Sequence, residues 1–191
     1  MRYPPFYAAR TRRRIVDDAS RRVRAEGLTG AAVSAVMRDA GLTHGGFYKH
    51  FRSKEHLVVE SLRQAFNEIA TMLARAAEHV PRRSAWKAIV NTYLSLQHCD
   101  HPERGCPVAA LASEFARADR TLKTQIAREM RNYRRRLLPF MPGRRAADKE
   151  RAFFTIISTM LGAIAIARIL PSKPERAQVL ATARRFLLRT F

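Results

Sequence analysis

Residues 41–57, GLTHGGFYKHFRSKEHL, contain two helix-start signals only ten residues apart. Thr43 and Ser53 have side-chain oxygens that accept hydrogen bonds from the free N–H groups of a first helical turn. The segment therefore predicts one helix of barely two turns, a break near Arg52, and then a long helix. A short helix that is both basic and rich in aromatic residues is a poor core element, and this combination favours contact with DNA.

Helical periodicity recurs along the whole chain, and strand signals are nearly absent. The predicted fold class is therefore all-α, with about nine helices. The first three are expected at about 11–26, 33–40 and 44–51, and the fourth starts at Ser53 and is long. Residues DHPERGCP are expected to form a loop. The last two helices are expected at about 147–169 and 174–190, separated by the breaker sequence PSKP.

The formal net charge of +20 and the isoelectric point of about 11.4 favour a polyanionic partner. Residues 1–56 hold 12 basic and 5 acidic residues, and residues 57–191 hold 24 and 11. Because the charge is only slightly denser near the N-terminus, it suggests nucleic acid as a partner without locating the binding site.

Cysteine usage and hydropathy predict a soluble, cytoplasmic protein with no membrane partner and no cofactor. Two cysteines do not make a disulfide framework. The longest uncharged run, residues 152–167, has 16 residues, fewer than the roughly 20 that cross a bilayer. Its Ser158 and Gly162 allow a second helix to approach closely, so we interpret this run as the core of a dimer rather than an anchor.

The residues GLT at 41–43 stand between the second and third predicted helices, which is the arrangement of a helix-turn-helix. In that motif the second helix enters the major groove and its first residues meet base edges. His44 and Lys49 can donate hydrogen bonds to bases or phosphates, and Tyr48 can donate to a phosphate oxygen. Gly45 and Gly46 remove side-chain bulk where the backbone approaches DNA, at about 1 kcal/mol each in helix propensity.

This stretch resembles the DNA-binding domain of the TetR family of bacterial transcription regulators. The resemblance is carried by AGLT at 40–43, Gly45, FY at 47–48, HF at 50–51, SKE at 53–55 and Leu57, and it extends over about 11–60. It implies an Ω-shaped homodimer with a helix-turn-helix domain at 1–56 and a ligand-sensing and dimerisation domain at 57–191. The residues then expected to contact DNA are Thr43, His44, Gly45, Gly46, Tyr48, Lys49, His50 and Lys54.

Two positions depart from the family pattern. Ala31 and Ala32 stand where members usually carry Ser or Thr, and Val23 replaces a common Phe. Phe47 and Phe51 are interpreted as core residues, since a three-helix domain needs aromatic filler. Other assignments stay open: His50 between packing and DNA, and the arginines at 10, 12, 13 and 14 between phosphate anchoring and a solvated face. The arginines at 131, 134, 135 and 136 are interpreted as solvated.

Cys106 precedes Pro107, which suits the first position of a helix. A thiol there would feel the positive end of the helix dipole, which lowers its pKa, so one hypothesis is a sensor of electrophiles or oxidants. The alternative is a small buried residue beside a ligand pocket. His98, Cys99 and His101 lie nearby in the sequence, but their spacing fits no closed zinc pattern, and no metal site is predicted.

The favoured function is a homodimeric, sequence-specific repressor that a small-molecule inducer releases from a near-palindromic operator in double-stranded DNA. Apolar patterning suggests Trp86, Tyr93, Phe115 and Tyr133 as pocket residues, although the same residues can simply be core. No oxyanion loop or orienting triad supports an enzyme. The alternatives kept are a thiol-based sensor acting through Cys106 and a basic protein that coats nucleic acid without sequence preference.

Overall fold

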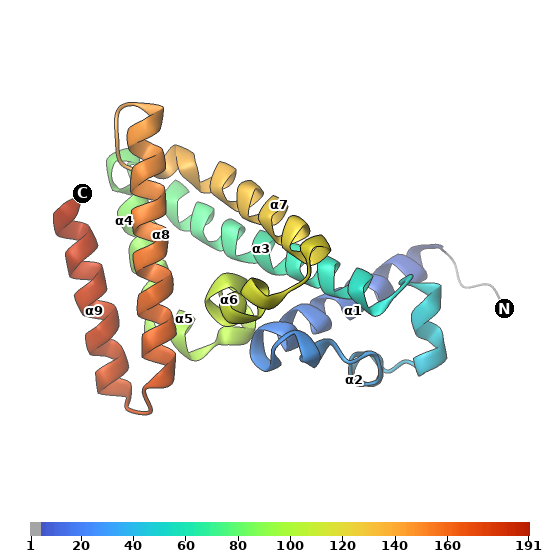
Figure 1. Cartoon of the computed structure of the whole chain (residues 1–191). Helices are drawn as coiled ribbons and strands as arrows, with labels where there is room; N and C mark the ends of the chain where they lie inside the picture. The colour runs from blue at the N-terminus through green and yellow to red at the C-terminus, as the bar shows by residue number, and fades with distance from the viewer. Residues whose placement is uncertain (1–4) are drawn as a thin grey trace.

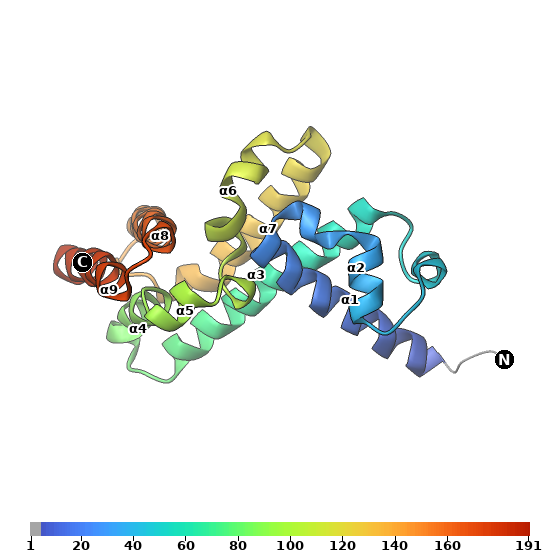
Figure 2. The same cartoon turned by 90° about the horizontal axis from the view of Figure 1, so that it is seen from below.

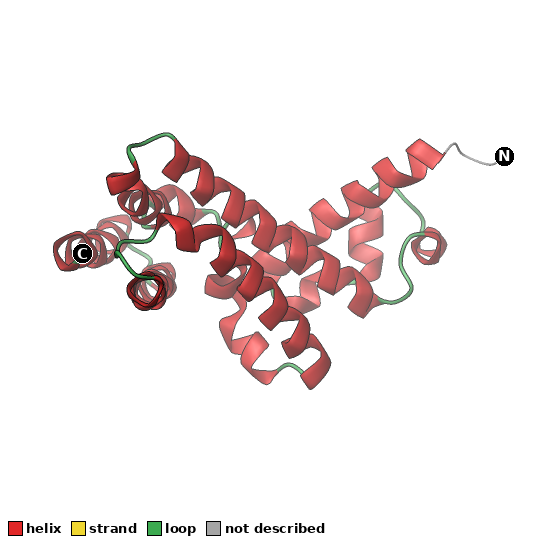
Figure 3. Cartoon of the chain, turned by 90° about the horizontal axis from the view of Figure 1, so that it is seen from above, coloured by secondary structure: helices red, strands yellow, loops and turns green. Residues whose placement is uncertain are grey.

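The computed structural model describes residues 5–191, and this part of the chain contains helices and turns but no strand (Figure 3). The predicted all-α fold is therefore confirmed. The α-helices are α1 (Pro5–Glu26), α2 (Val33–Asp39), α3 (Lys54–Glu78), α4 (Ala85–Tyr93), α5 (Leu96–Asp100), α6 (Pro107–Arg117), α7 (Arg120–Leu137), α8 (Ala146–Ile169) and α9 (Lys173–Thr190). Short 3₁₀ helices are η1 (Leu28–Ala31), η2 (His44–Lys49), η3 (Arg82–Ser84), η4 (Pro102–Arg104) and η5 (Leu138–Phe140).

The long helix α3 connects the two ends of the molecule. Its first half packs against α1, and its later part packs against α4 and α7 (Figure 1). Helices α8 and α9 form an antiparallel pair at the far end from α2 and η2, as both Figure 1 and Figure 2 show. The predicted cap is present, because the Ser53 hydroxyl accepts from the His56 backbone N–H at 3.2 Å.

Buried apolar side chains form two clusters that meet within α3. The smaller cluster contains Ile15, Val16, Ala19, Val36, Met37, Ala40, Phe47, Phe51 and Leu57. The larger one begins in α3 at Val58 and takes in the helices that follow, together with Val23 and Ala31 from the N-terminal segment. The change of cluster falls close to the predicted boundary at 56/57, and that boundary stays a prediction.

Three local predictions need correction. Helix α1 begins at Pro5 instead of about residue 11, since a proline fits a first helical turn, where its missing N–H is not needed. Residues 1–4 of the sequence lie outside the described residues. Within the predicted loop DHPERGCP, residues 102–104 form η4. The third predicted helix is a 3₁₀ helix, and Thr43 at its start makes no side-chain capping bond.

Helix α8 carries an exposed apolar stripe along its outer side. Phe154, Ile166 and Ile169 have exposed fractions of 54%, 55% and 80%. Gly162 lies in the same stripe, and a Cβ added there would meet no atom within 4 Å. The helix is also long and apolar enough to cross a membrane, by length and composition only. Its inner side, however, packs into the larger cluster through residues such as Phe153, Ile156 and Met160.

Candidate nucleic-acid interface

The segment from Gly41 to Ser53 is held in place from its inner side. Gly41 has φ +69°, a left-handed conformation that favours glycine, and this turn redirects the chain after α2. The backbone N–H of Leu42 donates to the Met37 carbonyl at 2.8 Å. Phe47 and Phe51 are 1% and 2% exposed and stack with ring centroids 5.4 Å apart. Their assignment to the core is therefore confirmed.

Burial of the phenylalanines turns the polar residues of η2 toward solvent. Tyr48 is 70% exposed, and its ring meets that of Phe47 edge-on at 5.3 Å, which supports the ring while leaving the hydroxyl outside. Gly46 and His50 are half-buried. The remaining candidates are all exposed: Thr43, His44, Gly45, Lys49 and Lys54. The exposed residues among them form the outer surface of η2 and its flanking residues, whose contact with DNA stays a prediction.

The two glycines of η2 are not required by packing inside the chain. A Cβ added at Gly45 would meet no atom within 4 Å, and one at Gly46 would be in ordinary contact with Met37 at 3.5 Å. Neither has the positive φ seen at Gly41. Because side chains fit at both positions, packing within the described chain does not require glycine at either of them.

His50 and Arg12 belong mainly to the scaffold of this surface. The Arg12 guanidinium pairs with Glu60 at 2.6 Å, lies over the Phe51 ring at 4.9 Å, and donates to the His50 carbonyl at 3.4 Å. Burial, with the positive charges of Arg12 and Lys49, lowers the pKa of His50. His50 is therefore neutral near pH 7 and adds no charge for a phosphate.

Two exposed arginines beside this surface were not among the predicted contacts. The Arg38 side chain on α2 is 78% exposed, and Arg52 is exposed at the break between η2 and α3. Helical phase identifies Arg38, because Val36 and Met37 face the core and residue 38 falls on the opposite side of α2. Arg52 lies in the predicted break itself. Both are candidate phosphate contacts.

Buried polar contacts connect this domain to the helices behind it. Arg24 of α1 is 3% exposed, pairs with Glu68 of α3 at 2.6 Å, and donates to the Gly105 carbonyl at 3.1 Å. A second link joins the backbone N–H of Leu28 to the Glu114 carboxylate of α6 at 2.8 Å. Any displacement of the start of α6 therefore reaches α1 through hydrogen bonds.

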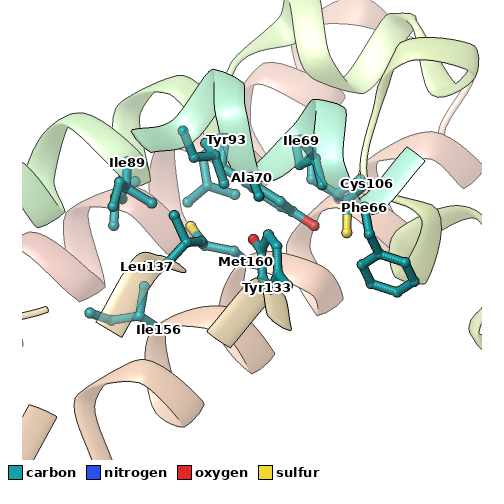
Figure 4. Packing of buried hydrophobic residues seen from close by; sticks show 14 of the residues in the cluster. Phe66, Ile69, Ala70, Ile89, Tyr93, Cys106, Tyr133, Leu137, Ile156 and Met160 are labelled. Atoms are coloured by element: carbon teal, nitrogen blue, oxygen red, sulfur yellow. The ribbon is translucent and has the colours of Figure 1, made fainter. Parts of the chain in front are cut away.

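The four predicted pocket residues are all buried in the larger cluster, but they do not form one site. Trp86 packs edge-on against Phe191, with ring centroids 6.2 Å apart. By contrast, the hydroxyls of Tyr93 and Tyr133 point toward the same interior space as the Cys106 thiol (Figure 4). Phe115 lies on α6 and contributes apolar surface. That any of these four residues binds a ligand stays a prediction.

Cys106 occupies the predicted N-cap of α6 with Pro107 at the first helical position, but its predicted thiol chemistry needs correction. Burial raises the pKa of this thiol and outweighs the lowering by hydrogen bonds from Tyr93 and the first turn of α6. The expectation of a lowered pKa is therefore wrong. A buried, protonated thiol is a poor nucleophile, so the geometry does not favour the electrophile sensor.

His98 fixes the backbone beside Cys106 instead of binding a metal. Its Nε2 accepts from the Cys106 backbone N–H at 3.0 Å, and its Nδ1 is 2.7 Å from the Tyr93 carbonyl oxygen. These contacts require a neutral ring with the proton on Nδ1. Burial lowers the pKa of His98 to about 4, which keeps it neutral. Within residues 5–191, no group of three His, Cys, Asp or Glu side chains is placed to hold a metal ion.

The helix-turn-helix segment is similar to a known family of proteins. Residues 15–60 match the model for bacterial regulatory proteins of the tetR family. The segment includes α2, η2 and the start of α3, so the match covers the surface described above. No curated protein sequence matches the chain.

The TetR-like architecture extends over the whole chain. A TetR-family transcriptional regulator from Cytophaga hutchinsonii has a TM-score of 0.75 at 18% identity, with 98% of this chain and 97% of that chain covered. The reduced form of NemR from E. coli has a TM-score of 0.75 at 19% identity, with 93% and 95% covered. FadR from Bacillus subtilis, solved with stearoyl-CoA, has 0.69 at 15%, with 94% and 98% covered.

These comparisons confirm the predicted TetR resemblance and the two-part helical fold. The matching model is described as one of bacterial regulatory proteins, and the solved structures are described as transcriptional regulators, in agreement with the expectation of a regulator.

Proposed function

We propose that this protein is a homodimeric, sequence-specific TetR-type repressor that a small-molecule inducer releases from its operator. The observation that carries the proposal is the outward face of η2, where exposed His44, Tyr48 and Lys49 flank glycines that the fold itself does not need. Two such faces, one per subunit, would occupy adjacent major grooves about 34–36 Å apart on a near-palindromic site.

The apolar stripe on α8 supports the homodimer. Isolated exposed apolar residues are common on proteins, whereas a continuous stripe indicates a partner surface. Phe154, Ile166 and Ile169 follow one face of α8, and Phe186 of α9 is also 55% exposed. Gly162 leaves the middle of this face open to close approach by a helix of a second copy. A paired α8–α9 unit from each subunit would form a four-helix bundle.

The buried links between the domains support release by a ligand. An inducer acts only if it binds the DNA-bound and free conformations with different affinity. The Arg24–Gly105 bond joins α1 to the residue before the N-cap of α6, and the Leu28–Glu114 bond joins η1 to the body of α6. A ligand that moves α6 would therefore tilt the DNA-binding domain and change the separation of the two η2 segments. FadR from Bacillus subtilis, a protein of similar fold, was solved in complex with stearoyl-CoA.

A mobility-shift assay on the DNA that flanks the gene for this protein tests the proposal. We expect one retarded complex that survives an excess of random DNA and dissociates when an extract containing the inducer is added. Sedimentation of the free protein should give twice the monomer mass. Equal competition by specific and random DNA would instead support the coating function, and a monomeric complex would contradict the homodimer.

A further inference from the structure

The interior space between α3, α4, α7 and the start of α6 contains polar groups that the protein leaves unused. The hydroxyls of Tyr93 and Tyr133 are fully buried. Within the described residues the Tyr133 hydroxyl has no hydrogen-bond partner, and the Tyr93 hydroxyl faces only the Cys106 thiol, a weak acceptor. Tyr93 is 1% exposed and Tyr133 is 7% exposed. A buried hydroxyl without a partner costs about 1–3 kcal/mol, so this arrangement is unfavourable for stability alone.

These groups form a single cluster. The Cys106 thiol interacts electrostatically with both tyrosine hydroxyls and raises the pKa of each, next to the dominant effect of burial. Figure 4 shows the two hydroxyls and the thiol directed into the same space, with Phe66, Ile69 and Met160 around them. All three polar groups are protonated at neutral pH, so each can donate a hydrogen bond.

A positive charge, that of Arg168, acts on this cluster, and Arg168 forms no ion pair within the described residues. Arg168 of α8 donates through Nε to the Cys99 carbonyl at 3.1 Å and through Nη2 to the His98 carbonyl at 3.0 Å. Its Nη1 is buried without a partner, and none of the ion pairs among residues 5–191 involves Arg168. The positive charge lowers the pKa of both Tyr93 and Cys106, so it acts on the same space.

We propose that this cluster is the effector site of the repressor, and that its ligand is a small apolar molecule carrying a carboxylate. Donors without acceptors select a ligand rich in acceptor oxygens, and an uncompensated guanidinium selects a negative one. The carboxylate binds Arg168 and Tyr93, Tyr133 donates to a further acceptor or to the same oxygen, and the apolar body replaces contacts between α3 and α7. This assignment rests on the proposed function only in calling the ligand an effector.

His98 and Gly105, next to the site, connect it with a surface hollow and with the DNA-binding domain. A surface hollow of about 520 Å³ is lined in part by His98, whose Nε2 holds the Cys106 backbone. On the other side, Gly105 accepts the hydrogen bond from Arg24 of α1. A Cβ added at Gly105 would lie 2.8 Å from His98 Nε2 and 2.9 Å from Arg168 Nη2, so the residues of the site are tightly packed around this link.

Three probes of similar shape test the ligand class without DNA. Benzoate carries a carboxylate, acetophenone a neutral carbonyl, and ethylbenzene no acceptor. Titration of the ¹⁵N-labelled full-length protein followed by NMR should give the tightest binding for benzoate and the weakest for ethylbenzene. If ethylbenzene binds as tightly as benzoate, the polar cluster is not the site. If acetophenone binds more tightly than benzoate, the proposal of a negatively charged ligand is wrong.

Removing a single oxygen gives a second, independent readout. Tyr133→Phe should raise the thermal unfolding midpoint of the unliganded protein, because it removes an unsatisfied hydroxyl. It should also weaken the binding of benzoate about tenfold and leave the affinity for ethylbenzene unchanged. Tyr93→Phe should weaken benzoate in the same way. Ser113→Ala, which removes an exposed oxygen on α6, is the control and should leave the affinity for benzoate unchanged.

A Tyr133→Phe variant that is less stable than the wild type, or that binds benzoate with unchanged affinity, would overturn the proposal. These measurements need no operator, so they succeed or fail separately from DNA binding. Release of the operator by benzoate in the wild type but not in Tyr133→Phe then connects the site to the proposed function.

Discussion

Phe47 and Tyr48 are neighbours in the chain with opposite tasks. The tight 3₁₀ turn of η2 directs the first ring into the core, where it is 1% exposed, and leaves the second 70% exposed above it. Such a pair makes a short helix rigid through one side chain while another remains free for a partner. The same division applies to His50 and Lys49, since the lysine is exposed whereas the histidine is half-buried and has a lowered pKa.

Gly45 provides a test of how closely DNA approaches. A Cβ added there meets no atom within 4 Å, and alanine has the higher helix propensity, so Gly45→Ala should keep or slightly raise the stability of the protein. If the backbone at this point lies against DNA, the added methyl group should weaken operator binding by at least about tenfold. Affinity by fluorescence anisotropy and the thermal midpoint check both parts. Unchanged affinity would show that the glycine does not face DNA.

At the scale of elements, η2 and α8 are both helices whose outer faces have no partner within the described chain. The faces differ in chemistry. The outer face of η2 is polar and basic, whereas that of α8 exposes the apolar residues Phe154, Ile166 and Ile169. The first is suited to a solvated polyanion, and the second is suited to another helix of the same kind.

Ile166→Asp should separate the dimer without unfolding the subunit. Ile166 is 55% exposed in the single chain, so a polar residue there costs the monomer little. In the proposed bundle it would place an unpaired carboxylate in an apolar contact, which costs several kcal/mol and weakens association more than about 100-fold. Sedimentation velocity should show a folded monomer. Ala112→Asp, at an exposed position on α6, is the matched control and should remain dimeric. A dimeric Ile166→Asp would place the interface elsewhere.

The all-α class, the core phenylalanines and the cap at Ser53 could be predicted because each depends on local periodicity or on a few adjacent residues. Helix α5, of only five residues, was not predicted. The 3₁₀ form of η2 could not, because it depends on how Phe47 and Phe51 enter the smaller cluster. The pKa of Cys106 could not either, since the dipole of α6 is local and visible in the sequence, whereas the burial that outweighs it comes from distant helices. For the same reason the sequence could not show that Tyr93 and Tyr133 face the same space whereas Trp86 packs elsewhere, against Phe191.

Across the whole molecule, the proposed DNA surface and the proposed dimer face lie at opposite ends, and buried polar contacts connect the space between them (Figure 1). Arg24 on one side and His98 on the other hold the backbone at Gly105 and Cys106. Hydrogen bonds of this kind have directional geometry, so they transmit displacement better than apolar packing alone. The stability of this region should therefore respond to the protonation of His98.

Unfolding at two pH values checks the role of His98. Its pKa is about 4 in the folded protein and about 6.5 in the unfolded chain, so between these values the unfolded state binds more protons. The free energy of unfolding should thus fall as the pH drops through this window, by about 2 kcal/mol between pH 7 and pH 5. Urea unfolding measures the change. His98→Gln should lose this part of the pH dependence, and the exposed His79→Gln should retain it. Equal pH dependence in all three proteins would contradict a neutral, buried His98.

Hydroxyl-radical footprinting on the DNA that flanks the gene tests the central claim most directly, because it reports where each subunit touches the duplex. The wild type should protect two half-sites whose centres lie about one helical turn apart, roughly 10 base pairs. Lys54→Ala and Tyr48→Phe should weaken both half-sites together, while Ala112→Asp should leave them unchanged. Two results would contradict a dimeric repressor that reads DNA through residues 43–54. One is uniform protection along unrelated DNA, and the other is protection of both half-sites that is unchanged in Lys54→Ala and in Tyr48→Phe.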